Sequence, residues 1–368
     1  MSRPLGLTPV DKLEFLILVD NFVEWLSALP PGFTQELSQH ILSKGVPIDT
    51  LTGLPVVDLD NYCCETTIGD QTHTVLFDSG PEPHSIERNI KSMKVDLTPL
   101  DGIVLSHWHR DHSGGITKVL EMREEQIIRQ SAQRIENVTV DLHPSRPIRR
   151  GISRPPEYTP ICTDPPDPTF TETQDRHGQV ELNDQPHEMI HSLGNKMGIG
   201  ISGEIERVTE FEVGLPGALT WMKDENGEEG WFNDHLIKDE RYAVVDVKGH
   251  GLVVFSACSH AGICNVIHSL LPLNRPIHAI VGGLHLAPIQ SQPAKQTVEF
   301  LSERIIPLPN YVLPLHCTGL EARAMLRDRL GDRVVPCGTG ISVVWSGTDE
   351  DDEILDEEGG FKIVSRVA

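Results

Sequence analysis

The feature of this 368-residue sequence that most limits its fold is a group of three histidines and one aspartate within six positions. His107 and His109 are two residues apart, so in an extended chain their side chains project to the same side. Asp111 and His112 follow at once, and the glycines at 114–115 let the backbone turn there. The spacing therefore predicts two adjacent metal sites built on one loop.

Apolar runs and turn signals around this group predict a mixture of strands and helices. Residues 12–20 have the short apolar run of a buried strand, and residues 61–68 and 73–77 flank Gly69-Asp70 as a hairpin. Residues 101–106 form the predicted strand that leads into the histidine group. Further strands are predicted at 242–247, 251–256, 276–281 and 310–315, and helices at 85–95, 116–131 and 319–330.

Three later histidines and one earlier aspartate follow apolar strands directly. His260, His285 and His316 each stand beside small or glycine residues just past a predicted strand, and Asp78 follows strand 73–77. Polar side chains at strand ends are typical of a site on the rim of a sheet. A single histidine of this kind is more often a hydrogen-bonded structural residue. Together with residues 107–112, these histidines become candidate ligands.

Composition excludes several classes of protein. The net charge of −23 disfavours a surface that tracks phosphates, so no nucleic-acid partner is expected. The early apolar run at 15–19 is too short for a signal sequence or a membrane span, which predicts a cytoplasmic protein without a membrane partner. Seven cysteines without a CxxC pair fit reduced thiols rather than a disulfide framework.

Two segments depart from the composition of the rest. Nine prolines between residues 144 and 188 make regular structure unfavourable there and predict an insertion or a covering lid. Acidic residues fill all but two positions of 349–358, which predicts a solvated tail. The expected organisation is one domain over residues 1–347 and an acidic C-terminal tail over residues 348–368.

The pattern from His107 to His112, with Asp78 after a strand, resembles the HxHxDH motif of the metallo-β-lactamase superfamily. More narrowly, the chain resembles the subgroup named for 7,8-dihydropterin-6-methyl-4-(β-D-ribofuranosyl)-aminobenzene-5'-phosphate synthase. Five short stretches carry this second resemblance, namely residues 17–21, 202–205, 257–263, 281–286 and 316–319. The resemblance implies an α+β fold, a four-layer αββα sandwich with metals at one rim.

The resemblance also implies a ligand set for two divalent metal ions. It assigns His107, His109 and His260 to one metal. It assigns Asp111, His112 and His316 to the other, with Asp78 orienting the ligand loop.

The wider superfamily places a bridging aspartate on a strand between His260 and His316. Here that strand ends in Gly282-Gly283-Leu284-His285. Two alternatives follow: His285 takes the place of the aspartate or contacts substrate, or the second metal site is weaker.

The ligand types indicate hydrolysis or a related transfer. Imidazole and carboxylate ligands favour zinc, with manganese or iron as alternatives. A metal-bound hydroxide is expected between the ions, with Asp111 both ligating and orienting it as the catalytic carboxylate. We expect Cys258 to be a packing residue rather than a nucleophile, because apolar neighbours raise the pKa of a thiol.

The substrate is expected to be a small molecule, and the resemblance suggests a phosphorylated or pterin-like one. Arg207, Lys196 and Arg150 are candidates for a phosphate contact, although each is more typical of a surface charge. A metabolite-binding regulatory protein with the same fold and little turnover is the alternative function, because the bridging aspartate is missing. An RNA-processing nuclease is disfavoured by the acidic composition.

Overall fold

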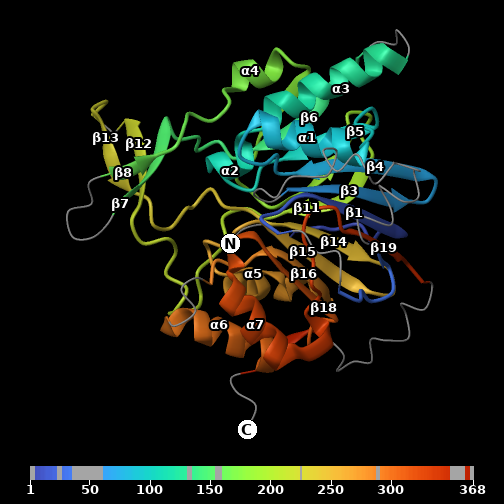
Figure 1. Ribbon diagram of the computed structural model, residues 1–368, viewed down its shortest axis with the longest axis vertical. Helices are drawn as coiled ribbons and strands as arrows, with labels where there is room; N and C mark the ends of the chain where they lie inside the picture. The colour runs from blue at the N-terminus through green and yellow to red at the C-terminus, as the bar shows by residue number, and fades with distance from the viewer. Residues whose placement is uncertain are drawn as a thin grey trace, which may run out of the picture.

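Two β-sheets packed face to face form the middle of the molecule, and helices cover their outer faces (Figure 1). The computed structural model describes residues 5–22, 27–34, 61–130, 135–153, 160–223, 226–286, 291–348 and 361–364. The arrangement confirms the four-layer αββα sandwich that the sequence predicts. None of the helices in these ranges is long and apolar enough to cross a membrane.

The first sheet has eight strands and carries the histidine-rich loop. In spatial order they are β2 (Phe33–Thr34), β19 (Ser342–Ser346), β1 (Lys12–Val19), β3 (Asn61–Ile68), β4 (Gln71–Phe77), β5 (Leu100–Val104), β6 (Val138–Leu142) and β9 (Gly178–Leu182). Strands β4, β5, β6 and β9 are parallel neighbours, and the other neighbouring pairs of this sheet are antiparallel. The parallel strands β4 and β5 therefore end at the same edge, where Asp78 and the loop from Leu105 begin.

The second sheet brings the later histidines to a common edge. Its order is β10 (His187–Ile190), β11 (Lys196–Ile201), β14 (Ala243–Val247), β15 (Gly251–Ser256), β16 (Ile277–Gly283) and β18 (Tyr311–Leu315). Strands β15, β16 and β18 are parallel neighbours. Because the carboxyl ends of parallel strands meet at one edge, His260, His285 and His316 all leave the sheet on the same side.

Helices cover the two sheets because their apolar side chains recur on one face. Helices α1 (Pro83–Met93) and α3 (Ile116–Gln130) pack on the first sheet, and α5 (Ile263–Leu270), α6 (Gln292–Glu303) and α7 (Leu320–Leu330) pack on the second (Figure 1). In α1, Ile86, Ile90 and Met93 are buried at the spacing expected of one helical face. Between the sheets, Phe15 meets Phe255 edge to face at 5.2 Å.

The proline-rich segment is structured, so the expectation of little regular structure over residues 144–188 is wrong. It contains β7 (Arg149–Ser153), β8 (Pro160–Thr163), the short helix α4 (Phe170–Gln174), β9 and the start of β10. Strands β7 and β8 join β12 (Ala218–Lys223) and β13 (Glu229–Asn233) in a four-stranded antiparallel sheet that projects from the sandwich (Figure 1). Proline is tolerated because Pro160 begins an edge strand.

The end of the chain returns to the domain. Strand β20 (Lys362–Ile363) pairs with β17 (Ile305–Ile306), and Phe361 beside it is buried. The acidic run at 349–358 lies outside the described residues. The C-terminal residues 361–364 are thus part of the packed structure rather than a free tail.

Candidate metal centre

A tight turn, rather than extended chain, brings the first histidines together. After β5, the His109 amide donates to the His107 carbonyl at 2.9 Å, and α2 (Arg110–Ser113) follows. This turn places His107 Nε2 2.8 Å from His109 Nδ1. Trp108 between them is fully buried and its indole N–H donates to the His143 carbonyl. The two imidazoles converge as predicted, although the extended geometry expected for them is wrong.

Three imidazoles form the first group, which we call the three-histidine cluster. His260, from the loop after β15, joins His107 and His109, and one ring nitrogen from each lies within 4.8 Å of the others. Burial lowers the pKa of all three, and nearby positive groups lower it further, so the rings are neutral. Neutral imidazole is the form that binds a metal ion.

The three-histidine cluster fits a cation on its hydrogen-bond pattern as well. Both ring nitrogens of His260 are buried and have no hydrogen-bond partner among the described residues. A buried polar atom without a partner is costly, and such atoms in native proteins call for a reason. A bound metal ion would satisfy one of these nitrogens together with the facing nitrogens of His107 and His109.

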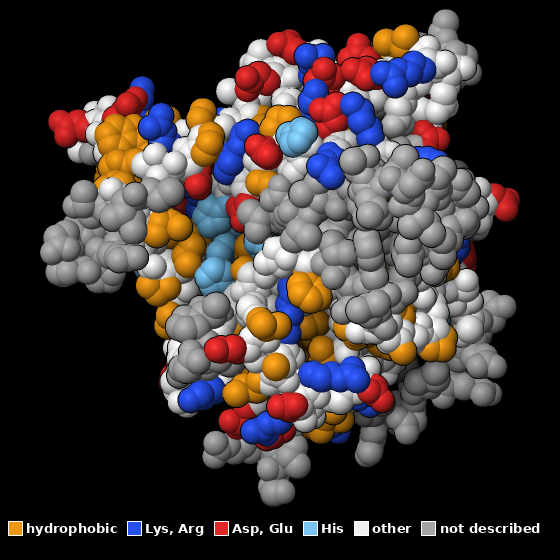
Figure 2. Space-filling view, in the orientation of Figure 1, with side chains coloured by type: hydrophobic (Ala, Val, Ile, Leu, Met, Phe, Trp, Pro, Cys, Tyr) orange, Lys and Arg blue, Asp and Glu red, His pale blue; other side chains and the backbone are white. Residues whose placement is uncertain are grey.

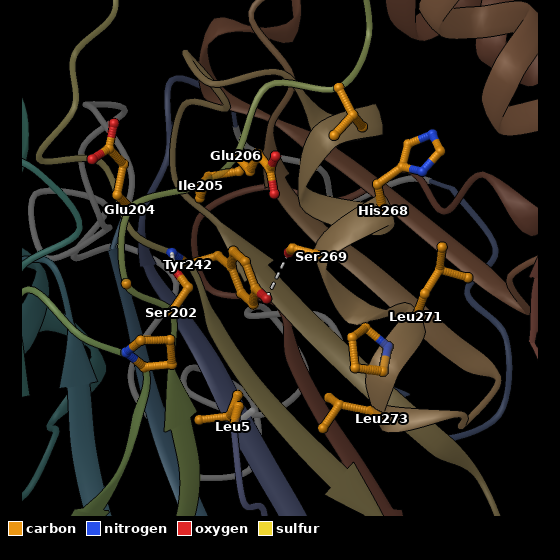
Figure 3. Close-up of a pocket in the computed structure, with 14 residues that line it drawn as sticks. Leu5, Ser202, Glu204, Ile205, Glu206, Tyr242, His268, Ser269, Leu271 and Leu273 are labelled. Carbon is orange, nitrogen blue, oxygen red and sulfur yellow. Dashed lines mark hydrogen bonds between the residues drawn. The ribbon is translucent and has the colours of Figure 1, made fainter. Parts of the chain in front are cut away.

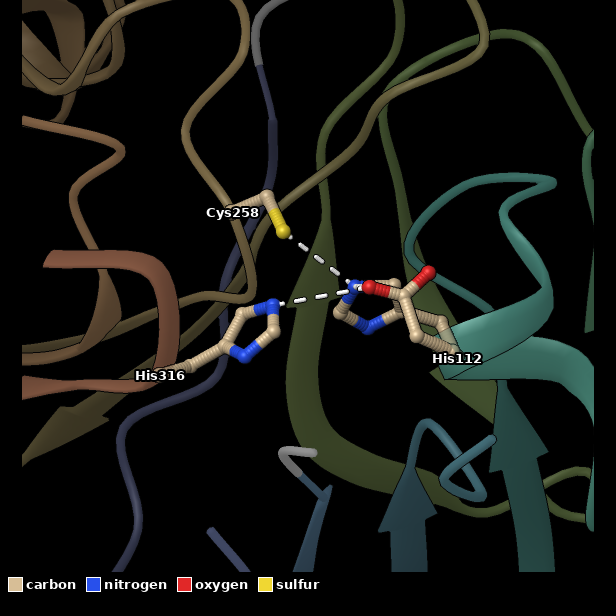
Figure 4. A group of neighbouring side chains, drawn as sticks. His112, Cys258 and His316 are labelled. Atoms are coloured by element: carbon tan, nitrogen blue, oxygen red, sulfur yellow. Dashed lines mark hydrogen bonds and ion pairs between the residues drawn. The ribbon is translucent and has the colours of Figure 1, made fainter. Parts of the chain in front are cut away.

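A second group, which we call the thiol cluster, contains Asp111, His112, Cys258 and His316 (Figure 4). His112 Nε2 lies 3.2 Å from Cys258 Sγ and 3.4 Å from Asp111 Oδ2. His316 Nε2 lies 3.6 Å from the same Asp111 oxygen. The residues that the resemblance assigned to a second metal are thus brought together, with a sulfur atom added.

Cys258 is buried as expected of a packing residue, and it also contributes a ligand-type atom to the thiol cluster. Burial raises the pKa of its thiol well above the usual value, as the apolar neighbours predict. Its sulfur nevertheless points into the thiol cluster from the loop after β15, toward His112 and His316 (Figure 4). The second cluster therefore has four ligand-type atoms without the bridging aspartate of the wider superfamily.

His285 lies outside both clusters of the described residues. Its ring packs against His260 with centroids 4.8 Å apart. It sits at the end of β16 with a positive φ of 44° and lines a cavity beside the three-histidine cluster. Its position in the cavity wall favours contact with substrate, which stays a prediction.

Asp78 fixes the ring orientation of one histidine in each cluster. Its carboxylate accepts the Ser106 amide and hydroxyl, each at 2.7 Å, and the His112 Nδ1–H at 2.8 Å. Because the Ser106 hydroxyl donates to Asp78, it must accept from His107 Nδ1, 2.9 Å away. Both histidines therefore carry their proton on Nδ1, which leaves Nε2 free for a metal.

We expect Asp78→Asn to lower metal affinity about 10- to 100-fold, the usual cost of removing a residue that orients metal ligands. The amide can no longer accept from Ser106 and His112 in the same way, so the ring tautomers are no longer fixed. Competition with a chromophoric chelator would measure the affinity. Asp101→Asn is the matched control, since Asp101 also accepts from a histidine ring and a backbone amide, at the start of β5. Equal losses in the two variants would contradict the assignment.

Three buried carboxylates that the sequence analysis missed hold the ligand loops. Glu240 accepts the His260 and Ala261 amides at 2.7 and 2.5 Å, Asp239 accepts the Trp108 amide at 2.7 Å, and Asp20 accepts the His316 amide at 2.8 Å. Burial raises the pKa of Glu240 to about 7. The available signal was acidic residues directly beside apolar strands, before residues 242–247 and after residues 12–19.

The three candidate phosphate contacts lie in different surroundings. Arg150 is buried rather than a surface charge, and pairs with Asp234 at 2.8 Å and Asp239 at 2.5 Å. Lys196 is an exposed charge paired with Glu188. Arg207 donates to the Leu236 carbonyl. Each cation is therefore engaged by the chain itself.

One cavity among the described residues is separate from both clusters. It measures about 500 Å³ and lies beside α5, where the Tyr242 and Ser269 hydroxyls are 2.8 Å apart (Figure 3). Its lining includes none of the cluster residues. The cavity that adjoins the three-histidine cluster, with His260 and His285 in its wall, is smaller at about 350 Å³.

The fold and the two clusters define a class of protein. Residues 66–186 match the sequence pattern of the metallo-β-lactamase superfamily. The crystal structure of Tm1679, described as a metal-dependent hydrolase of the β-lactamase superfamily, superposes with a TM-score of 0.60 at 19% identity, covering 91% of this chain and 99% of that one. The chain thus has the metallo-β-lactamase fold, and over residues 66–186 it is similar in sequence to the metallo-β-lactamase superfamily.

The chain is also similar to two proteins of Methanocaldococcus jannaschii. One is 7,8-dihydropterin-6-methyl-4-(β-D-ribofuranosyl)-aminobenzene-5'-phosphate synthase, 24% identical over 268 residues that cover 69% of this chain and 78% of the relative. The other is an uncharacterized protein, 23% identical over 252 residues that cover 68% of this chain and 82% of the relative. The narrower resemblance seen in the sequence is confirmed as a similarity.

Proposed function

We propose that this protein is a metal-dependent hydrolase of small molecules, with one divalent cation in each cluster. The observation that carries the proposal is the three-histidine cluster, whose nitrogens converge beside a cavity. Three protein ligands leave one coordination position open, which is the pattern of catalytic rather than structural zinc sites. A divalent cation held in this way lowers the pKa of a coordinated water to about 7.

The chain's own residues would orient the attacking water and keep a proton acceptor beside it. Asp111 is the residue we propose for this task, because its carboxylate belongs to the thiol cluster and its side chain, 28% exposed, is the most exposed of that cluster. Burial alone would raise the pKa of Asp111, but His112 and His316 outweigh burial and hold that pKa well below its usual range. The carboxylate therefore stays ionised and able to accept a hydrogen bond.

The thiol cluster supports zinc in the second position. It brings four ligand-type atoms within 4.8 Å of one another, the number that a closed zinc site uses, and a thiolate ligand would favour zinc over manganese or magnesium. In this account the thiol cluster binds its ion firmly and holds Asp111 in place, while the open position belongs to the three-histidine cluster.

Cys258→Ser is expected to remove the second metal while the first remains. With cobalt in place of zinc, a sulfur-to-cobalt charge-transfer absorption should appear in the wild-type protein and be absent from the variant. Metal analysis should fall from two equivalents to one. Cys264→Ser is the matched control, because Cys264 is also buried nearby but belongs to neither cluster. An unchanged absorption in Cys258→Ser would contradict the thiolate assignment.

The hydrolase proposal itself is tested by turnover. Zinc-loaded protein should hydrolyse at least one member of a panel of carboxylic esters, lactones and phosphoesters. The alternative function, a metabolite-binding protein with little turnover, was suggested by the missing bridging aspartate. The thiol cluster has four ligand-type atoms without that aspartate, so its absence is a weaker reason to expect an inactive protein. Tight binding of a small molecule with no turnover of any panel member would favour the alternative. Specific RNA cleavage would contradict the absence of a nucleic-acid partner.

A further inference from the structure

The cavity beside the three-histidine cluster is built as an apolar pocket. Its wall includes His260 and His285 on the side of the cluster. Apolar side chains make up most of the remainder: Phe211, Val213, Leu215, Pro216, Leu284, Leu286, Pro293 and Ala294. Figure 2 shows histidine side chains at the surface in a hollow, with hydrophobic side chains alongside. A substrate group that reaches the open coordination position would contact these apolar side chains.

The pocket has no permanently charged cation to receive an anionic group, and His285, whose pKa is raised because Cys317 outweighs burial, is its one titratable positive group among the described lining residues. None of its described lining residues is lysine or arginine. Its one carboxylate, Glu212, accepts the Cys264 and Asn265 amides at 2.9 Å each and the Thr209 hydroxyl at 3.0 Å. These are the first amides of α5, and a helix N-terminus is where a phosphate would otherwise bind. The chain has filled that anion site with its own side chain.

Helix α6, which also borders the pocket, has its N-terminus capped by a side chain of the protein as well. The Ser291 hydroxyl accepts the Ala294 amide at the start of α6, 3.3 Å away. Gly262 shows how closely Glu212 is held, because a Cβ atom at that position would lie 2.1 Å from the Glu212 carboxyl. An incoming anion would therefore meet a carboxyl group that already occupies the helix N-terminus, together with apolar carbon.

We infer that this pocket binds an uncharged apolar group of a carboxylic ester substrate, rather than a phosphorylated group. The inference rests on the proposed hydrolase function and specifies its substrate. In the reaction, water forms a new bond from its oxygen to the acyl carbon, and the bond from that carbon to the alkoxy oxygen breaks. The alcohol leaves with a proton that came from the water, and the acid remains.

The test compares neutral and anionic ligands of one shape. Wild-type protein should hydrolyse p-nitrophenyl butyrate with a kcat/KM about 10²-fold or more above that for the monoanionic p-nitrophenyl succinate, since an apolar pocket must desolvate the charge. Calorimetry should show that 4-phenylbutanamide binds to the same metal-loaded protein. This second measurement does not depend on turnover.

Two valine variants make the test specific to the pocket. Val213→Lys places a cation on its wall at a side chain that is already 51% exposed, so folding should be preserved. This variant should bind 4-phenylbutanamide more weakly. It should also reduce the ratio of kcat/KM for the neutral ester to kcat/KM for the anionic ester about 10-fold. Val208→Lys is the matched control, because Val208 is 52% exposed and lines the separate cavity of about 500 Å³ beside α5. It should change neither quantity.

The outcomes separate the two claims. Ester turnover without preference for the neutral substrate, or a ratio unchanged by Val213→Lys, overturns the pocket assignment and leaves the hydrolase intact. Amide binding that Val213→Lys weakens, with no member of the ester, lactone and phosphoester panel hydrolysed, supports the pocket and overturns the hydrolase. Turnover of a phosphoester but of no carboxylic ester overturns the pocket assignment and leaves the hydrolase intact.

Discussion

Replacing His260 with alanine is expected to lower ester hydrolysis by about 10³-fold or more and to remove one equivalent of metal. A metal ion contributes several kcal/mol of transition-state stabilisation, and each 1.36 kcal/mol corresponds to about tenfold in rate. With His260 gone, only His107 and His109 remain in the three-histidine cluster. Steady-state kinetics and metal analysis on the same sample would measure both effects.

This variant should remain folded, which makes the loss of activity informative. The backbone at His260 and Ala261 is held by the Glu240 carboxylate, and those hydrogen bonds do not involve the imidazole. The ring itself has no hydrogen-bond partner among the described residues. His250→Ala is the control, because His250 lies in the turn between β14 and β15 and bonds to the Ser346 carbonyl. Full activity with two metals in His260→Ala would refute the cluster's role.

The second large effect is on stability. Asp141→Asn is expected to lower the free energy of unfolding by about 3–5 kcal/mol, because it leaves a buried cation without its counter-charge. Arg241 is fully buried and its Nη1 lies 2.5 Å from the Asp141 carboxylate, which also accepts from His187 at 2.8 Å. Urea unfolding would measure the difference. Asp70→Asn, in the exposed β3–β4 turn, should be neutral.

The stability that Asp141 contributes depends on pH in a defined direction. Burial would raise its pKa, but Arg241 and His187 outweigh burial and lower that pKa below 3.8. The contribution is therefore present above pH 3.8 and is lost as the pH falls further. For His187, burial is outweighed by Asp141, which raises the pKa above 6.5. Its contribution is present below pH 6.5 and is lost as the pH rises through the raised value. Both slopes should be flattened in Asp141→Asn, and an unchanged pH profile would contradict this assignment.

Much of the fold could be predicted because buried strands have local signals. The apolar runs that end near His260, His285 and His316 coincide with β15, β16 and β18, and helix α7 begins within one residue of its expected start. Ligand-type residues at strand ends could be found because parallel strands place their ends together. These features depend on neighbouring residues and on a general rule of sheet geometry.

The contacts that were missed join residues far apart in the sequence. Cys258 stands in an apolar stretch, so its local signal is that of a packing residue; its place beside His112 depends on how the two sheets meet. Asp239 holds the amide of Trp108 across 131 positions. The prolines of residues 144–188 wrongly predicted irregular structure, because proline is tolerated in an edge strand. Pro160 begins the edge strand β8, which pairs with β7.

The most direct test of the two-metal account is a crystal structure of the purified protein with anomalous data at the zinc edge and a metal analysis of the same preparation. We expect two ions, one bound by His107, His109 and His260 at about 2.0–2.1 Å and one bound by Cys258 Sγ at about 2.3 Å. A folded protein that contains no metal, or one whose Cys258 sulfur binds none, would contradict the account.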